Sequence, residues 1–218
     1  MKVIELGKTN SVMNQFVAQM RDKKVQKDPM RFRRNLERLG EIFAYEISKT
    51  FDYQDTEVVT PLGIANVPQM KGDVVVATIL RAGLPLHGGI LNFFDGAQNA
   101  FVAAYRKYSK GGNFHINIEY CTSPALDGKI LILADTMLAT GASIEVAYER
   151  LLEEGKPAVT HLVCPISSKY AVEEIKKYFT KEDNVTLWTA AIDEELTTRS
   201  YIVPGLGDAG DLAFGEKL

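Results

Sequence analysis

A carboxylate and a turn of small residues stand close together after one apolar run of the chain. Asp135 follows ILILA (130–134), and Thr140 to Ser143 lead into the amphipathic segment IEVAYERLLEE (144–154). Small residues at a helix start let backbone N–H groups and hydroxyls close around a phosphate. A carboxylate in front of such a turn can accept hydrogen bonds from sugar hydroxyls. We therefore interpret residues 140–143 as a phosphate loop.

Two arginines also stand at the ends of apolar runs. VVVATIL (74–80) leads into Arg81, and AFVAAY (100–105) leads into Arg106. Open parallel sheets bind ligands beyond the carboxyl ends of their strands. Arginine holds an anion there through forked, charge-assisted hydrogen bonds. With Asp135 and the phosphate loop, the arginines predict a site for a sugar that carries phosphates at both ends.

Each signal has an ordinary structural explanation when it is taken alone. An Asp after a strand is as often a turn or helix cap as a ligand group, and TGAS also fits an ordinary helix start. An isolated Arg at a strand end is usually a surface residue. The order of these groups along one chain is the specific feature.

The elements that must position these groups follow from hydrophobic periodicity. Continuous apolar runs that partly alternate with amphipathic segments indicate strands buried on both faces. We predict an α/β fold with a mainly parallel sheet flanked by helices, formed by residues 1–218 as a single domain. FHINIEY (114–120) alternates apolar and polar residues, which predicts an edge strand or part of a flap. The predicted sheet strands are 74–80, 100–105, 130–134, 159–165 and 185–191.

Two helices and a β-hairpin are predicted before the sheet. Apolar residues recur at helical spacing over 12–20 and, after the cap-like Asp28-Pro29 pair, over 32–47. The β-branched residues of 53–67, interrupted by proline and glycine, predict a hairpin or a pair of short strands.

Charge and composition limit the function classes. A net charge of −3 and a pI near 5.7 give no global attraction to nucleic acid or anionic membranes. Residues 21–38 nevertheless hold eight basic and three acidic side chains. They form either a solvated helix face or subunit contact, or a site for RNA or an effector phosphate. No apolar run is long enough to span a membrane, and Cys121 and Cys164 show no disulfide pattern. We therefore expect a cytoplasmic protein without a membrane partner.

Three segments carry a resemblance to a known family. ILILADTMLATGAS (130–143) resembles the ribosyl-diphosphate signature of the type I phosphoribosyltransferases. ILRAGL (79–84) and YIVPGLGDAGDLAFG (201–215) are similar to further blocks of the members that act on uracil, and the similarity extends over essentially the whole chain. The resemblance implies transfer of the 5-phosphoribosyl group from 5-phosphoribosyl 1-diphosphate (PRPP) to uracil. The products would be UMP and diphosphate, a step of pyrimidine salvage.

The resemblance also implies a role for each site residue. Asp135 would hold the ribose hydroxyls, Arg81 and Arg106 would meet the diphosphate, and Asp208 would face the ribosyl diphosphate or its Mg²⁺. These four form the implied catalytic set. The loop around the 5-phosphate would comprise Thr136, Met137, Leu138, Ala139, Thr140, Gly141, Ala142 and Ser143. The positions that meet uracil, mainly through the backbone, would be Ile202, Gly207, Asp208 and Ala209.

The implied cofactor is Mg²⁺, bound mainly through PRPP or diphosphate, with few protein ligands. The histidines fit this, because His87, His115 and His161 lack metal-ligand spacing. The implied partners are uracil, PRPP, further copies of the chain in a homodimer or higher homo-oligomer, and GTP as a candidate effector. Nucleic acid is not expected.

The chain departs from the family pattern near the predicted site. Gly88 stands where an acid is usual, Thr136 where proline is usual and Ala142 where a second glycine is usual. Because Asp135, both arginines and the C-terminal block are intact, we expect activity.

Two other functions compete with this one. GLGDAG (205–210) has the G-x-G-x-x-G spacing of a dinucleotide site, but that motif needs a preceding strand, a following helix and an acid about 20 residues on. Only eight residues follow Gly210, so we do not expect a dinucleotide site. The second alternative is a PRPP- or nucleotide-sensing RNA-binding regulator on the same fold that uses residues 21–38. The intact C-terminal block and the acidic net charge favour the enzyme.

Overall fold

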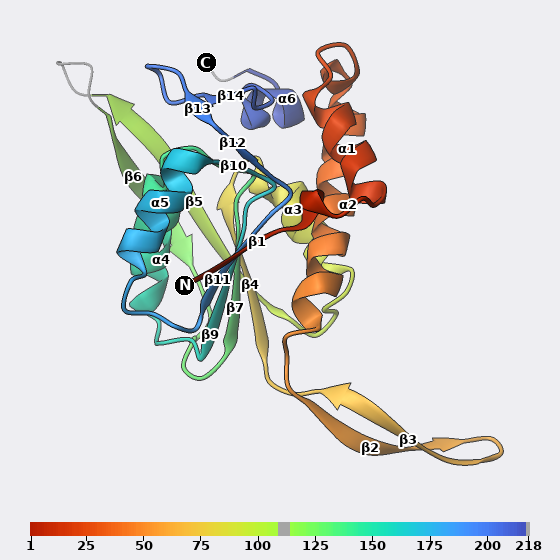
Figure 1. The fold of residues 1–218 in the computed structure, drawn as a ribbon. Helices are drawn as coiled ribbons and strands as arrows, with labels where there is room; N and C mark the ends of the chain where they lie inside the picture. Colours follow the sequence, from red (N-terminus) through yellow and green to blue (C-terminus); the bar gives the residue numbers. More distant parts are fainter. Residues whose placement is uncertain (109–113, 217–218) are drawn as a thin grey trace.

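The structure, a computed structural model, describes residues 1–108 and 114–216, and side chains outside residues 105–116. A seven-stranded sheet with the order β1-β11-β9-β7-β4-β5-β6 lies at its centre (Figure 1). Neighbouring strands are parallel except β5 and β6, which pair antiparallel. The predicted α/β fold with a mainly parallel sheet is confirmed.

The strands of this sheet are β1 (Lys2–Glu5), β4 (Val74–Leu80), β5 (Gln98–Tyr108), β6 (Phe114–Thr122), β7 (Ile130–Ala134), β9 (Val159–Val163) and β11 (Val185–Thr189). Each predicted strand is present, and β6 is an edge strand, as its alternation indicated. The prediction missed β1 at the opposite edge. It also made β9 and β11 too long, because the chain bends after Val163 and Thr189 into a second sheet.

This second sheet consists of three short parallel strands, β8 (Met137–Leu138), β10 (Ile166–Ser168) and β12 (Ala191–Asp193), in the order β12-β10-β8. They continue the chain beyond the carboxyl ends of β7, β9 and β11. Backbone hydrogen bonds join the sheets at the bend, for example from Asp135 N to the Val163 oxygen at 3.0 Å. The small sheet therefore extends the ligand-binding end of the main sheet.

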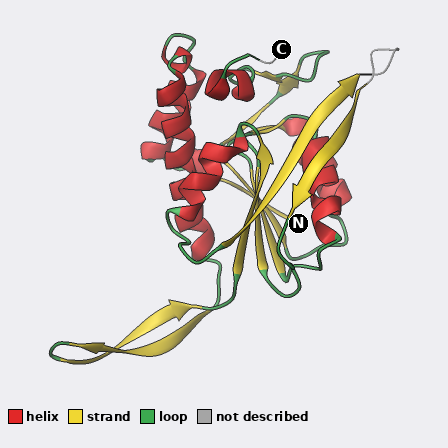
Figure 2. Cartoon of the chain, turned by 180° about the vertical axis from the view of Figure 1, so that it is seen from behind, coloured by secondary structure: helices red, strands yellow, loops and turns green. Residues whose placement is uncertain are grey.

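Helices cover both faces of the main sheet (Figure 2). Helices α1 (Val12–Arg21), α2 (Pro29–Ser48) and α3 (Gly83–Leu91) share one apolar core with Val76, and α4 (Ala142–Leu152) and α5 (Lys169–Tyr178) share another with Val75. Successive strand residues point to opposite faces, so one strand supplies both cores. In the described part of the chain, no helix has the length and apolar character needed to cross a bilayer.

The two predicted N-terminal helices are confirmed as α1 and α2. The carboxylate of Asp28 accepts hydrogen bonds from the backbone N–H groups of Met30 and Arg31, at 3.0 and 3.1 Å, and Pro29 takes the first helical position. Short 3-10 helices precede α1 at η1 (Leu6–Lys8) and α2 at η2 (Val25–Lys27).

The predicted hairpin is also present and reaches further than expected. Strands β2 (Tyr53–Thr60) and β3 (Gly63–Met70) pair antiparallel and project away from the body (Figure 1). At the other end of the molecule, the antiparallel pair β13 (Glu195–Leu196) and β14 (Ile202–Val203) leads into α6 (Ala209–Phe214). These C-terminal elements lie beside the start of α2 and the carboxyl end of the sheet (Figure 1).

Candidate active site

The predicted site residues Asp135, Arg81 and Arg106 come from three consecutive strands, because β4 lies between β7 and β5. Thr78 pairs with Ala134, the residue before Asp135, and the Thr78 hydroxyl donates to the Ala134 oxygen at 3.2 Å. The strand order thus brings Asp135 and the Arg81 backbone to neighbouring positions. Arg106 lies inside β5 rather than after it, and its side chain is outside the described residues.

The phosphate loop, over the full range that the family resemblance implies (136–143), contains β8 and ends in the first turn of α4. Gly141 precedes the helix with a left-handed φ of 92°, and a Cβ there would stand 3.2 Å from the Ile175 side chain. This conformation and the tight contact favour glycine. Asp135, Thr140, Gly141 and Ser143 belong to the lining of a recess with about 250 Å³ of empty space, partly open to solvent.

The phosphate-loop residues differ in what they can present to a ligand. Thr136 and Leu138 are buried, so any contact to a phosphate would come from their backbone. Thr140 and Ser143 are partly exposed at the recess and can offer hydroxyls. The first turn of α4 also supplies backbone N–H groups, which carry the positive end of the helix dipole.

Ser168 supports the phosphate loop, and the sequence analysis did not identify it. Its hydroxyl donates to the Ala139 oxygen at 2.7 Å and accepts the N–H of Ala171 at 2.9 Å. It therefore caps α5 and holds the loop with one buried side chain. A serine in front of the amphipathic segment 169–178 is a recognisable cap signal, but its contact to the loop is not visible in sequence.

Asp135 stands at the mouth of the recess. Its carboxylate accepts the backbone N–H of Thr136 at 2.7 Å. Cys164 lies nearby in the interior, where burial chiefly, and the charge of Asp135 secondarily, raise the pKa of its thiol well above its usual value. Cys164 is thus a buried packing residue of the core.

The C-terminal loop (202–209) contains the positions expected to meet uracil. Ile202 is buried in β14 and pairs with Leu196, Gly207 is exposed with a φ of 96°, and Ala209 begins α6. The Asp208 carboxylate accepts the N–H groups of Gly210 and Asp211 at 2.9 and 3.1 Å, so it also caps α6. That capping contact was not predicted.

The dinucleotide alternative does not survive this geometry. GLGDAG (205–210) follows a strand of a two-stranded antiparallel ribbon, not a strand of the main sheet, and α6 has six residues. The fingerprint requires a strand of the parallel sheet and a full crossover helix.

Two arginines hold α6 beside the end of β4. Arg81 Nη2 lies 3.3 Å from Asp211 Oδ1 and 3.2 Å from the Gly215 oxygen, and Arg33 Nη1 donates to the Ala213 oxygen at 2.7 Å. Arg81, which follows a cis peptide bond, is exposed and thus open to a ligand as well as to α6. These contacts bring the C-terminal loop to the same end of the sheet as Asp135.

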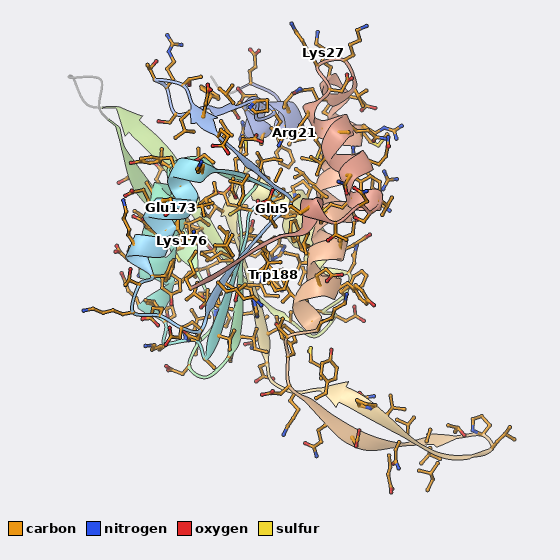
Figure 3. The ribbon with its side chains drawn as sticks, in the orientation of Figure 1. Glu5, Arg21, Lys27, Glu173, Lys176 and Trp188 are labelled. Atoms are coloured by element: carbon orange, nitrogen blue, oxygen red, sulfur yellow. The ribbon has the colours of Figure 1, made fainter. Side chains whose placement is uncertain are left out.

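Four of the eight basic side chains in segment 21–38 are engaged within the chain, while Lys23, Lys24, Lys27 and Arg31 are exposed. Arg21 contacts Asp193, and Arg38 stands over the Phe16 ring at 5.1 Å and donates to Asn35. Figure 3 shows Arg21 beside the C-terminal elements and Lys27 at the outer end of the helical layer. These contacts favour the structural explanation of the segment over an RNA site.

The described residues contain no group of three or more His, Cys, Asp or Glu side chains that could hold a metal ion. His87 and His161 are buried, and His161 accepts a hydrogen bond from Trp188 in the core. The carboxylates of Asp135 and Asp208 are hard oxygen donors of the kind that Mg²⁺ prefers. This donor set suits an ion that receives most of its ligands from a phosphorylated substrate.

Comparisons with known proteins show what the whole chain is similar to. The family described as uracil phosphoribosyltransferase matches residues 8–216. A uracil phosphoribosyltransferase of Porphyromonas gingivalis is 56% identical over 220 residues, which cover 100% of both chains. One from Methanothermobacter thermautotrophicus is 38% identical over 191 residues, 87% of this chain and 86% of that protein. Among solved structures, the AQ2163 protein from Aquifex aeolicus superposes with a TM-score of 0.87 at 29% identity, covering 98% of both chains.

Proposed function

The chain belongs to the uracil phosphoribosyltransferase family, and we propose on that premise that it transfers the 5-phosphoribosyl group of PRPP to uracil, giving UMP and diphosphate. The observation that carries the proposal is the meeting of Asp135, Arg81 and the C-terminal loop at one end of the sheet. A phosphate loop, a sugar-binding carboxylate and a base-binding backbone are the parts that this reaction needs.

The chemistry follows from these positions. Diphosphate leaves C1 of the ribose while positive charge develops on the sugar, and N1 of uracil attacks from the opposite face and releases its proton. The phosphate loop fixes the 5-phosphate, and Asp135 holds the ribose hydroxyls with a negative charge that favours the cationic transition state. Arg81 and Arg106 hold the diphosphate, so catalysis is mainly positioning and electrostatics.

We include Mg²⁺ as the cofactor. The carboxylates of Asp135 and Asp208 would hold it together with oxygens of the substrate, since no described cluster offers a complete ligand set. When bound, the ion supplies positive charge that stabilises the leaving diphosphate.

The C-terminal loop supports the choice of uracil. Gly207 is exposed and lacks a side chain, so its backbone groups are accessible to a flat ligand. If N–H donors meet the uracil carbonyls and a C=O accepts N3–H, cytosine would face mismatched groups at two positions. A site built to pair such groups rejects the mismatched analogue by roughly 10⁴-fold.

Purified protein with PRPP, Mg²⁺ and uracil, cytosine or orotate tests the proposal. UMP should form from uracil, with much slower reaction of the other two bases. Orotate should fail because its carboxylate beside N1 crowds the attacking position. Absence of UMP would refute the function, and comparable rates with cytosine would refute base selection by the loop.

Self-association is part of the proposal, and the hairpin β2–β3 supports it. Its side chains are largely exposed, with Val59 at 83% and Ile64 at 67% of full exposure. An isolated two-stranded hairpin is marginal in water, and exposed apolar side chains on it favour burial against another surface. We propose that a second copy provides that surface in a homodimer or higher oligomer. Sedimentation of Val59→Lys/Ile64→Lys should show weaker association.

Three further assignments rest on the family alone or on composition. We propose pyrimidine salvage in the cytoplasm, where the free thiols Cys121 and Cys164 would stay reduced. We also propose GTP as an effector, which the UMP assay tests when it is repeated with GTP. Residues 1–218 are proposed to act as one phosphoribosyltransferase domain.

The RNA-regulator alternative finds no support in the relatives or in the engaged arginines of α1 and α2.

A further inference from the structure

A largely buried ion pair contacts the C-terminal loop. Arg21, the last residue of α1, donates to both carboxylate oxygens of Asp193, at 2.7 and 2.8 Å. The side chains are 22% and 9% exposed, so water screens the pair little. Forked, charge-assisted hydrogen bonds of this kind define orientation as well as energy.

Both members of the pair form hydrogen bonds with the backbone of Gly205 in the C-terminal loop. The Gly205 N–H donates to Asp193 Oδ2 at 2.9 Å, and the Gly205 oxygen accepts from Arg21 Nη1 at 2.9 Å. Both polar groups of this peptide position are thereby turned toward the pair. Gly205 has a φ of 52°, and a Cβ there would overlap the Ile202 oxygen, so the loop is tightly folded at this point.

Gly205 lies between the positions proposed to meet uracil. Ile202 precedes Gly205 by three residues, and Gly207 follows it by two. The backbone can rotate only about φ and ψ at each residue. Fixing both hydrogen-bonding groups of Gly205 therefore restricts the positions of the backbone groups of Ile202 and Gly207.

Asp193 also connects the loop to the phosphate loop. It ends β12, which pairs with β10, and β10 pairs with β8 inside the phosphate loop. One continuous hydrogen-bonded sheet thus runs from the segment that would hold the 5-phosphate to the carboxylate that holds Gly205. The spacing between base and ribose depends on this connection.

We propose that Arg21 and Asp193 are positioning residues that set the register of uracil against PRPP. The proposal rests on the proposed transferase function. Neither side chain needs to touch a substrate. Loss of the pair displaces the C-terminal loop, while the phosphate loop keeps its own support from Ser168.

The test compares KM for uracil with KM for PRPP in Asp193→Asn and Arg21→Lys. Asn keeps the size of Asp193 but not its charge, and Lys keeps the charge of Arg21 but not its fork. We expect uracil KM to rise roughly tenfold or more, since small misplacements of a reacting group cost up to about 10²-fold, and PRPP KM to stay within about twofold. Binding of PRPP, read as its shift of the melting temperature, should persist.

Glu194→Gln is the matched control. Glu194 adjoins Asp193 and pairs with Lys169 at 2.9 Å, but both side chains are exposed at the surface. Its loss should leave both KM values unchanged. The double variant Arg21→Met/Asp193→Leu removes both charges and so avoids an unpaired buried ion if a single variant fails to fold. It should fold and retain the selective uracil defect.

Unchanged uracil KM in the folded variants, or equal rises of both KM values, would overturn the proposal while wild-type UMP formation stands. Failure of the wild-type chain to make UMP would instead refute the transferase function, and the pair's role with it.

Discussion

The hydroxyl of Ser168 donates to the carbonyl oxygen of Ala139 at 2.7 Å and so ties the phosphate loop to the start of α5. The hydroxyl oxygen of Ser168 also accepts the N–H of Ala171, at 2.9 Å. One side chain thus connects a helix cap to the segment that we propose holds the 5-phosphate. A comparison of Ser168 with a serine that only caps a helix therefore separates an effect on PRPP binding from an effect on stability.

Ser168→Ala should weaken PRPP binding as well as stability. Loss of one hydrogen bond to the loop is worth about 1 kcal/mol, which corresponds to a roughly fivefold higher PRPP KM. Ser11→Ala is the control, because Ser11 caps α1 by accepting the N–H of Met13 at 3.2 Å and has no contact to the loop. Loss of each cap should cost about 1 kcal/mol of unfolding free energy, and Ser168→Ala should lose about 1 kcal/mol more because its second hydrogen bond also goes. Equal PRPP KM values in the two variants would contradict the loop-supporting role.

Asp135→Asn should lower kcat by about 10²-fold without unfolding the chain, because the amide keeps the size but loses the charge that favours the transition state. Asp127→Asn is a suitable control. Asp127 also accepts one backbone N–H, that of Lys156 at 2.9 Å, but precedes β7 at its other end. Steady-state UMP formation measures both. Wild-type turnover in folded Asp135→Asn would move the sugar site elsewhere.

Arg81→Ala should weaken diphosphate binding more than uracil binding. Arg81 stands at the end of β4 and is exposed, and it also contacts α6 through Asp211. Product inhibition by diphosphate, measured against PRPP, gives the affinity for diphosphate. Asp211→Asn removes the ion pair but leaves the guanidinium in place, so it should retain diphosphate affinity. Equal losses in both variants would assign Arg81 to the support of α6 alone.

Gly88→Ala and Gly89→Ala should have opposite effects on stability. A Cβ on Gly88 would meet no atom within 4 Å, so alanine should stabilise α3 by about 0.5–1 kcal/mol. A Cβ on Gly89 would overlap the carbonyl oxygen of Glu37 in α2, so alanine should force the helices apart. Urea denaturation of both variants measures the difference. Stabilisation by both would mean that α2 and α3 do not pack this closely.

His161 should make stability depend on pH. Its Nδ1 accepts from Trp188 Nε1 at 3.1 Å, its Nε2 has no hydrogen-bond partner in the described part of the chain, and burial lowers its pKa from 6.5 to about 4. Between these values the unfolded chain binds the proton and the folded chain does not, so stability falls as pH falls, by up to about 1.4 kcal/mol per pH unit.

His161→Gln tests this, since Gln offers an acceptor to Trp188 but does not titrate. Its unfolding free energy should fall less between pH 7 and about pH 5 than that of the wild type. Urea denaturation at both pH values provides the comparison. An identical fall in both proteins would show that other groups cause the pH dependence.

The sequence by itself determined the main strands and helices, and it predicted which residues form the site. Continuous apolar runs specify β4 and β7 to the residue, and Asp28-Pro29 specifies the start of α2, because these signals depend on neighbours a few positions apart. The motif around Asp135 and its resemblance to a family supplied the function, which the family match supports.

Only the tertiary structure decided how these parts support one another. Arg21 and Asp193 are 172 positions apart, and Arg81 and Gly215 are 134 apart. No local pattern distinguishes an arginine that will be buried against a carboxylate from one on a solvated helix face, since the difference lies in which strands pair. The bends after Val163 and Thr189 were hidden for the same reason. Ala190 and Ala191 are small enough to continue β11. Pro165 marks an end of β9 but not the direction of the bend, because the hydrogen-bond partners in the second sheet come from distant parts of the chain.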